Sequence, residues 1–323
     1  MKKPLIIAEV GQAHDGSLGQ AHAFIDAIAE SGADVVKFQM HIASEESTTA
    51  DKFRIPFSKQ DKSRYDYWKR VEFTEEEWSS LADHAKKVGL SFVCSTFSLL
   101  AVERLKKIGV AAWKVGSGDL NFQVMMERIL ETNLPIWVST GMAKISDIEI
   151  VATYLANKNA DFTLFQCTTM YPTPLEYVGV NILTLLKNKF NCKVGMSDHS
   201  GTIFPAIYSI LQGVSLIEVH VNFDKRMFGP DTSSSLDFKE LKLVCEARDA
   251  FEKLKNNPVD KDDVADMLAK NKNLFGRSLA LSKDMRKGEI ITNYDFKEKK
   301  PGTGINPSRI NEFVNKTLAR DVK

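Results

Sequence analysis

Two histidines, His199 and His220, stand at the ends of two neighbouring strands expected near the end of the main domain. Each follows a short apolar run, and each has an acidic residue close by, Asp198 and Glu218 respectively. Imidazole is the commonest metal-ligating side chain, and a catalytic metal needs few protein ligands because it keeps open positions for substrate. The pair therefore suggests an enzyme with a divalent metal. The alternative is two ordinary polar residues at strand ends.

A second set of side chains is of the type that holds a phosphate dianion. Lysine supplies positive charge, while hydroxyls and loop amides supply directed hydrogen bonds. Gly116 and Gly118 flank one of the hydroxyls and let backbone amides approach a ligand closely. The alternative, lysines that line a barrel incidentally, is costly for a buried lysine without an anionic partner. The set is Lys37, Lys114, Ser117, Ser139 and Ser197. Metal and phosphate groups on one rim suggest a phosphorylated substrate with a carbonyl partner that the metal polarises.

Eight short β-rich runs alternate with helical stretches from the start of the chain to about residue 255. The expected strands are Leu5–Val10, Asp34–Gln39, Ser91–Ser95, Ala111–Val115, Pro135–Ser139, Phe162–Cys167, Lys193–Met196 and Leu216–Val221. The expected helices cover residues 18–31, 74–88, 98–108, 122–132, 145–157, 178–189, 203–212 and 236–255. The fold class is therefore α/β, and a closed (β/α)8 TIM barrel is favoured over a doubly wound open sheet. An open sheet would usually have fewer strands and an early GxGxxG motif.

Such a barrel gathers its active-site groups at the carboxyl ends of the strands, and every expected strand here ends in polar or ionisable residues. In chain order they are Glu9, Lys37, Gln39, Ser95, Thr96, Lys114, Ser117, Ser139, Thr140, Thr168, Tyr171, Ser197, Asp198, His199, Glu218 and His220. One polar strand end is ordinary. Eight that converge on one rim predict an enzyme.

Composition excludes some classes of protein. Lys and Arg total 43 against 42 Asp and Glu, and so small a net charge argues against a general nucleic-acid binder. The four cysteines lack CxxC spacing, which favours reduced thiols over a disulfide framework. The apolar run before Glu9 is too short for a signal peptide, and no stretch approaches about 18 apolar residues. We therefore expect a soluble, cytoplasmic protein with no membrane partner.

The connection between the second strand and its helix, residues 41–74, is unusually long. Loops beyond about 15 residues are usually functional or disordered. This segment is too apolar for a free linker, because it carries Phe53, Ile55, Phe57, Tyr65, Tyr67 and Trp68. We expect either a partial lid that helps to choose the substrate or a surface insertion that packs on its own aromatic residues.

Composition also divides the chain into three parts. Residues 1–255 form the barrel, residues 256–272 read as a charged linker, and residues 273–323 form a small β-rich module. Turns are expected at Lys287–Glu289 and Pro301–Gly304 of this module. About 50 residues are too few for a robust independent core, so we expect the module to dock onto something.

An ordered set of motifs resembles the sialic acid synthase family, which makes nine-carbon nonulosonic acids. The motifs are AEVGQAHDG, VVKFQ, CSTFS, KVGSGD, STGM, CTTMYPTP, GMSDHSG, EVHV, GPD and PGTGI. Within the family, the long loop looks most like that of the legionaminic acid synthases. The resemblance implies a (β/α)8 barrel followed by a small antifreeze-like (SAF) domain. It also implies condensation of phosphoenolpyruvate with an N-acetylated mannosamine-type sugar, with Mn or Mg as cofactor.

The resemblance also assigns roles to residues. His199 and His220 would ligate the metal, and Glu9 would orient or deprotonate water or a sugar hydroxyl. Phosphoenolpyruvate would be bound by Thr96, Lys114, Ser117, Ser139 and Ser197, with Lys37 supporting its charge. The acceptor sugar would be bound by Gln39, Tyr171 and Asp231. The family further implies a domain-swapped homodimer, in which the terminal module caps the barrel of the partner.

Three positions depart from the family pattern. Thr169 stands where the family commonly has Asn, and Asp119 where it often has Glu. Lys300 stands where the terminal module of sialic acid synthases presents an arginine to the partner's sugar, and lysine lacks the bidentate fork of arginine. Relatives often continue beyond the point that corresponds to Lys323, so we expect a truncated cap.

The favoured activity is synthesis of a legionaminic-type nonulosonic acid from phosphoenolpyruvate and 2,4-diacetamido-2,4,6-trideoxymannose. N-acetylneuraminate synthase, acting on N-acetylmannosamine, and pseudaminic acid synthase are alternatives within the family. A barrel synthase of the 3-deoxy-octulosonate phosphate type is the nearest rival outside it. A catalytically inactive carbohydrate- or ice-binding barrel is a rival of a different class.

Overall fold

The computed structural model describes residues 3–323, which divide into two compact units that meet between Leu254 and Lys255. This division lies close to the boundary at residue 255 that the sequence predicts. Among the described residues, no helix combines the length and the apolar character needed to cross a membrane.

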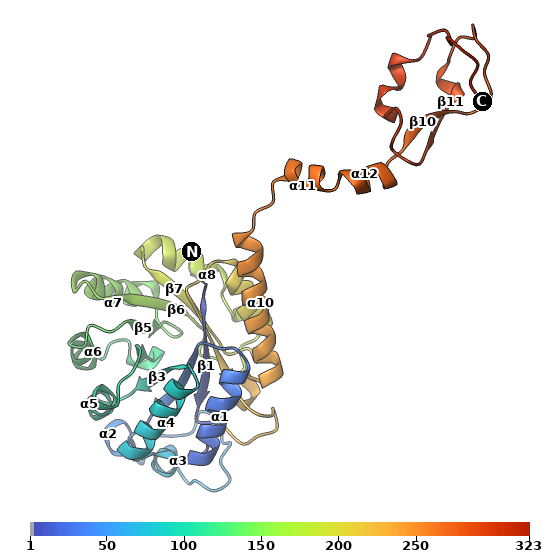
Figure 1. Ribbon diagram of the computed structural model, residues 1–323. Helices are drawn as coiled ribbons and strands as arrows, with labels where there is room; N and C mark the ends of the chain where they lie inside the picture. Colours follow the sequence, from blue (N-terminus) through green and yellow to red (C-terminus); the bar gives the residue numbers. More distant parts are fainter. Residues whose placement is uncertain (1–2) are drawn as a thin grey trace. The chain divides into compact units, whose positions relative to one another are not determined.

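The first unit is a closed barrel of eight parallel strands (Figure 1). Each strand pairs with the next along the chain, and β1 pairs with β8 to close the ring. The strands are β1 (Leu5–Gly11), β2 (Val35–Met40), β3 (Ser91–Thr96), β4 (Trp113–Val115), β5 (Ile136–Ser139), β6 (Phe162–Gln166), β7 (Lys193–Asp198) and β8 (Leu216–Val221). The prediction of a (β/α)8 barrel is confirmed.

A helix follows each strand and packs on the outside of the ring, as α1, α4 and α7 show in Figure 1. These helices are α1 (Leu18–Glu30), α4 (Glu75–Lys87), α5 (Leu99–Ile108), α6 (Gln123–Leu130), α7 (Ile145–Asn157), α8 (Asn181–Phe190), α9 (Phe204–Leu211) and α10 (Phe238–Asn256). Side-chain caps fix several starts. Thr74 accepts from the Glu77 amide while Glu77 reaches back to the Thr74 amide, which is a capping box.

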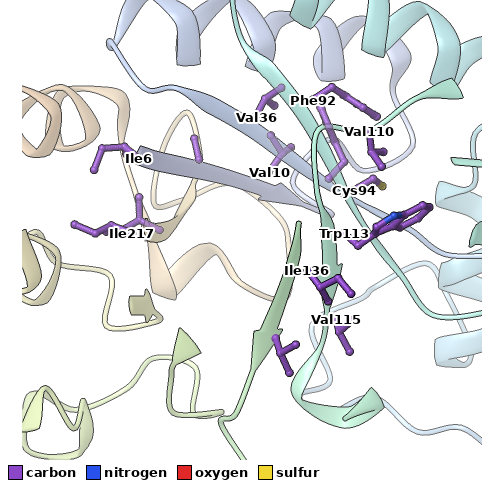
Figure 2. Close-up of a cluster of buried hydrophobic side chains, with 14 of the residues drawn as sticks. Ile6, Val10, Val36, Phe92, Cys94, Val110, Trp113, Val115, Ile136 and Ile217 are labelled. Carbon is purple, nitrogen blue, oxygen red and sulfur yellow. The ribbon is translucent and has the colours of Figure 1, made fainter. Parts of the chain in front are cut away.

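Strand residues alternate between two apolar layers. One layer lies between strands and helices, and Figure 2 shows part of it, including Ile6, Val36, Cys94 and Trp113. The other fills the barrel interior with Ile7, Val35, Val93, Ala112, Trp137, Phe165 and Leu216. Gly195 on β7 makes room for the ring of Phe165, because a Cβ at Gly195 would lie 2.8 Å from it.

Three elements lie outside the eight predicted units. The long β2–α4 segment contains α2 (Ala43–Glu46) and α3 (Arg64–Val71), and β9 (Ser235–Leu236) pairs in parallel with the end of β8. Tyr67 and Trp68 on α3 form a small buried cluster with Ala43 and Val71, against which further loop aromatics pack. The segment therefore does pack on its own aromatic residues, as one of the two expectations proposed.

The second unit contains α11 (Lys261–Met267), α12 (Ala269–Phe275) and an antiparallel pair, β10 (Ser278–Leu281) with β11 (Phe296–Lys299). Isolated bridges join Met285 to Val322 and Ile290 to Thr317. The expected linker, residues 256–272, is thus partly helical. Short 3₁₀ turns complete the chain: η1 (Ser117–Asp119), η2 (Leu175–Tyr177), η3 (Thr232–Ser234), η4 (Asn293–Asp295) and η5 (Pro307–Glu312).

Candidate active site

A cavity of about 520 Å³ opens at the carboxyl ends of the barrel strands. Side chains along each strand point alternately inwards and outwards, which explains which residues form the floor of the cavity. Two positions after each residue that fills the barrel interior comes a residue that lines the cavity. These floor residues are Glu9, Lys37, Ser95, Lys114, Ser139, Cys167 and Glu218. Thirteen of the fifteen predicted site residues line the cavity: Glu9, Lys37, Gln39, Lys114, Ser117, Asp119, Ser139, Thr169, Tyr171, Ser197, His199, His220 and Asp231.

Two lysines and two glutamates form a buried network on this floor. Lys37 Nζ lies 2.8 Å from Glu9 Oε2 and 3.7 Å from Glu218 Oε1. Lys114 Nζ lies 3.4 Å from the same Glu218 oxygen. None of the four side chains is more than 4% exposed. Such burial is tolerable because each charge has at least one partner of opposite sign.

The surroundings shift the pKa values of this network in different directions. Burial alone would raise the pKa of Glu218, but Lys114 and Lys37 outweigh it and lower the pKa to about 2. Burial likewise opposes the charge on Lys37, yet Glu218 and Glu9 raise its pKa. Burial lowers the pKa of Lys114, whereas the negative charge of Glu218 raises it. The effect of burial is the larger of the two, so the pKa of Lys114 is lowered. A bound anion near Lys114 would therefore stabilise its charged form.

Serine hydroxyls surround the two lysines. Lys37 Nζ donates to Ser95 Oγ at 3.1 Å, and Lys114 Nζ donates to Ser139 Oγ at 2.7 Å. Ser197 Oγ donates to Glu218 Oε1 at 3.0 Å. Paired ammonium and hydroxyl groups of this kind can bind the oxygens of a phosphate or carboxylate group.

The two histidines lie together beside this floor. The His199 and His220 ring centroids are 5.2 Å apart, at an interplanar angle of 70°. His199 Nδ1 donates to the Thr168 carbonyl at 2.8 Å, so a neutral ring keeps a lone pair on Nε2. That atom lies 3.2 Å from the hydroxyl of Tyr171. Burial, and then His220, lower the pKa of His199 to about 3, which keeps the imidazole neutral.

These histidines fit an open metal site better than a closed one. Neutral imidazole with its second nitrogen bonded to a carbonyl is the arrangement found at metal-ligating histidines. Glu218 Oε2 nearby is buried without a hydrogen-bond partner. Across residues 3–323, no group of three or more His, Cys, Asp and Glu side chains could hold a metal ion. A metal held by His199 and His220 would therefore keep positions free for other ligands.

The expectation for Thr96 is corrected. Its hydroxyl donates to Met125 Sδ on α6 at 3.4 Å, so the side chain faces the helix layer and not the cavity. The physical reason is the period of two along a strand, which turns Ser95 inwards and Thr96 outwards. Ser95 is the residue of β3 that lines the cavity and meets Lys37.

The segments that follow β4 and β5 meet where side chains pack tightly against the backbone of Gly141. Ser117 Oγ accepts from the Gly141 amide at 2.9 Å. A Cβ at Gly141 would collide with Thr169 Oγ1 and would lie 2.8 Å from Cys167 Sγ. Burial raises the pKa of nearby Asp119 to about 6, with Glu46 adding to the effect.

The long segment also contributes to the lining of the cavity, and five of its lining residues were not singled out by the sequence-based interpretation: His41, Glu46, Asp51, Arg54 and Arg64. Arg54 Nη2 donates to Asp231 Oδ1 at 2.8 Å and to the Pro230 carbonyl at 3.1 Å. Its guanidinium lies 4.0 Å from the ring centroid of Tyr171. The segment therefore reaches over the cavity, which agrees with the other expectation, a partial lid. His41 continues the inward alternation of Lys37 and Gln39, a signal present in the sequence, whereas nothing in the sequence marks Arg54.

Lys300 belongs to the second unit, where its Nζ lies 5.6 Å from the ring centroid of Phe275. Its expected contact with a sugar stays a prediction.

Comparisons with known proteins agree with this architecture. A model of the NeuB family matches residues 24–259. The N,N'-diacetyllegionaminic acid synthase of Campylobacter jejuni is 34% identical, over 100% of this chain and 98% of that protein. A pseudaminic acid synthase of the same species is 32% identical, over 100% of this chain and 94% of that protein. The crystal structure of the N-acetylneuraminic acid synthetase of Leptospira borgpetersenii has a TM-score of 0.73 at 25% identity, and the match covers 84% of this chain and 92% of that one. The chain therefore belongs to the NeuB family, which confirms the resemblance carried by its ordered motifs, and it is an enzyme.

Proposed function

We propose that this enzyme condenses phosphoenolpyruvate with an unphosphorylated N-acylated mannosamine-type sugar, releasing phosphate and a nonulosonic acid. The observation that carries the proposal is the cavity floor, where two buried lysines with hydroxyl partners lie in one cavity with the His199–His220 pair. A cavity of about 520 Å³ is of a size that suits small-molecule substrates.

The phosphoenolpyruvate anion is assigned to the Lys114 side of the floor. Lys114 has only partial compensation from Glu218, so an anion there supplies the missing negative charge. Ser139 already accepts from Lys114, and Ser117 and the Gly141 amide lie close together on the same side. The positive charge of Lys37 is already paired with Glu9 and Glu218, so Lys37 attracts the phosphoenolpyruvate anion only at longer range.

A divalent metal, Mn or Mg, is assigned to His199 and His220. When bound, it would act as a Lewis acid that polarises the aldehyde carbonyl of the open-chain sugar. The Thr168 carbonyl holds the His199 ring in the tautomer that leaves Nε2 unprotonated. Removing the metal with a chelator should abolish turnover, and titrating Mn into the apoprotein should restore it in the wild type but not in His199→Ala.

The proposed condensation uses these residues in the following order. Carbon 3 of phosphoenolpyruvate attacks the aldehyde carbon, whose oxygen becomes an alkoxide, and positive charge develops at carbon 2. Water adds at carbon 2, the C–O bond to phosphate then breaks, and the proton of the carbon 2 hydroxyl leaves with the phosphate as the keto group forms. The proton released when water adds neutralises the alkoxide. Glu9, held by Lys37 and Gln39, passes on that proton or orients the water. Lys114 and the serines stabilise the departing phosphate.

The favoured acceptor is 2,4-diacetamido-2,4,6-trideoxymannose, which gives a legionaminic-type acid. Support comes from the legionaminic acid synthase of Campylobacter jejuni, at 34% identity, although a pseudaminic acid synthase follows at 32%. The outer lining is also apolar enough for a 6-deoxy carbon, since it includes Phe53, Ile55, Phe57, Phe97 and Met142.

The enzyme is proposed to act in the cytoplasm as a homodimer, in which the terminal module, an SAF domain, caps the barrel of a second copy. The second unit has little core of its own: Met285 and Ile291 are its buried hydrophobic residues among those described, while Phe275 and Tyr294 are 64% and 93% exposed. Sedimentation of the full chain against one that ends at Leu254 tests this, because only the full chain should dimerise.

Mass spectrometry of the products tests the activity. Phosphoenolpyruvate is offered in parallel with N-acetylmannosamine, with 2,4-diacetamido-2,4,6-trideoxymannose, and with the sugar precursor of pseudaminic acid. A nonulosonic acid formed fastest from the second sugar supports the proposal. Formation only from a phosphorylated sugar would favour the octulosonate phosphate type, and no product from any sugar would contradict the proposed activity.

A further inference from the structure

A chain of four polar side chains joins the rim of the cavity to its floor. Glu46 Oε1 lies 2.7 Å from His41 Nδ1, and His41 Nε2 lies 3.1 Å from Gln39 Oε1. Gln39 Nε2 then donates to Glu9 Oε1 at 2.6 Å. All four residues line the cavity, and the hydrogen bonds between them are unbroken.

The direction of these hydrogen bonds is set at the Glu9 end. Glu9 pairs with Lys37 Nζ at 2.8 Å, and a carboxylate only accepts. Gln39 must therefore present Nε2 to Glu9 and Oε1 to His41. Gln12 Nε2 also donates to Gln39 Oε1, at 3.2 Å, which holds the amide in the same orientation.

The state of His41 follows from its surroundings. Its ring is stacked between Trp68, at 3.7 Å and 10°, and Phe97, at 4.3 Å and 5°. Burial in this stack, followed by the charge of Arg64, lowers the pKa of His41 to about 3. A neutral His41 has one proton, and that proton must be on Nε2 to reach Gln39 Oε1. Nδ1 then has only a lone pair, so its partner Glu46 has to be the donor.

The surroundings of Glu46 agree with a protonated carboxyl. Its side chain is 8% exposed, and burial raises its pKa to about 8. The positive charge of Arg64 on α3 opposes this shift, and neighbouring carboxylates support it. The titratable and charged groups that face Glu46 are His41, Asp51, Arg64, Glu72 and Asp119.

We propose that Glu46 is a positioning residue held as a neutral carboxylic acid. Its proton sets the donor-to-acceptor direction of the hydrogen bonds that run through His41 and Gln39 and orient Glu9. If Glu46 lost this proton, His41 could donate to it from Nδ1 and would turn a lone pair towards Gln39 Oε1. Gln39 would have to rotate its amide, and its oxygen would then face the Glu9 carboxylate. Glu9 would lose a donor and its fixed position. The effect on turnover rests on the proposed function, whereas the protonation of Glu46 does not.

The first test measures protonation without any substrate, using Glu46→Gln. The glutamine amide can donate to His41 as the protonated acid does, but it does not titrate. The folded-state pKa of about 8 exceeds the usual 4.5, so between these values the folded wild type keeps a proton that the unfolded chain has released. Wild-type stability should therefore fall relative to Glu46→Gln as pH rises from about 4.5 to about 8, and the difference should then level off. A difference in melting temperature that stays constant with pH would overturn the proposal.

The second test compares pH profiles of kcat/KM for wild type, Glu46→Gln and Glu46→Ala. Wild-type activity should decline above about pH 8, and the profile of Glu46→Gln should lack that decline. Glu46→Ala, which cannot donate to His41, should be impaired by about tenfold or more at every pH. Equal alkaline declines in wild type and Glu46→Gln, or equal impairment of both variants, would contradict the positioning role. If the protein turns over no sugar at all, the proposed function fails, and the stability measurement still decides the state of Glu46.

Discussion

Lys114 Nζ lies 3.4 Å from Glu218 Oε1 on the floor of the barrel, and neither side chain is more than 4% exposed. The two residues are far apart in sequence and come from β4 and β8, across the ring. Because the interior is filled by apolar side chains two positions below them, the pair is cut off from water on that side. Its charge balance can therefore respond strongly to an anion that binds from the cavity.

Lys114→Met should destabilise the fold and also abolish turnover. Removing one partner of a buried ion pair leaves an uncompensated charge and costs about 3–5 kcal/mol. The double variant Lys114→Met/Glu218→Gln removes both charges and should recover much of that loss, while it remains inactive. Denaturant unfolding of both variants measures the difference. Additive losses in the double variant would show that the two residues do not interact.

Gly195→Ala should destabilise the barrel through overpacking. The added methyl group would lie 2.8 Å from the ring of Phe165, and overpacking of this kind costs about 1–3 kcal/mol. Gly19→Ala on α1 is a matched control, because nothing lies within 4 Å of a Cβ there. The control should be neutral or stabilising, since alanine favours helix over glycine. Urea unfolding of the two variants should thus give effects of opposite sign, and equal effects would contradict the packing of Phe165.

The buried side chain of His14 should make the fold less stable in acid. Burial lowers its pKa to about 3 from the usual 6.5, with His41 contributing. Between pH 6.5 and about pH 3, His14 binds a proton in the unfolded chain but not in the folded protein. The stability of the fold therefore falls as pH drops through this range. His14→Asn can keep the acceptor for the Gly16 amide, which lies 3.1 Å from His14 Nδ1, and does not titrate in this window. The variant should lose less stability on acidification than the wild type, by up to about 1.4 kcal/mol per pH unit. Parallel curves for the two proteins would argue against a neutral buried imidazole.

Arg54→Ala should weaken binding of the sugar more than it slows chemistry. Arg54 joins the long segment to Asp231 and to the Tyr171 ring, both assigned to the sugar. We expect KM for the sugar to rise about tenfold with kcat nearly unchanged, the pattern for loss of uniform binding. Arg54→Lys should recover only part of this, because an ammonium lacks the planar fork. A fall in kcat with unchanged KM would place Arg54 in the chemistry instead.

The sequence predicts the barrel well because each strand and helix carries a strong local signal. Seven of the eight predicted strands agree with the structure to within one residue at their start, and β4 begins two residues later than expected. The error at Thr96 arose at the level of single side chains. The resemblance to the family placed Thr96 in the site. The alternation of the strand, with Val93 and Ser95 facing inwards, indicates instead that Thr96 faces the helices.

The long segment was harder to predict, because its structure depends on contacts with the cavity. The helix α3 did have a local signal, since Ser63 caps it by accepting from the Asp66 amide. His41 could also have been found, as the next inward position after Gln39. Arg54 could not, because its place depends on Asp231, 177 residues further along the chain.

Phosphate release from phosphoenolpyruvate, measured with and without sugar, tests the central claim most directly. We predict release that requires Mn or Mg and an unphosphorylated N-acylated amino sugar, and that is lost in Lys114→Met and in His220→Ala. Release without sugar, or release only with a phosphorylated sugar, would contradict the account.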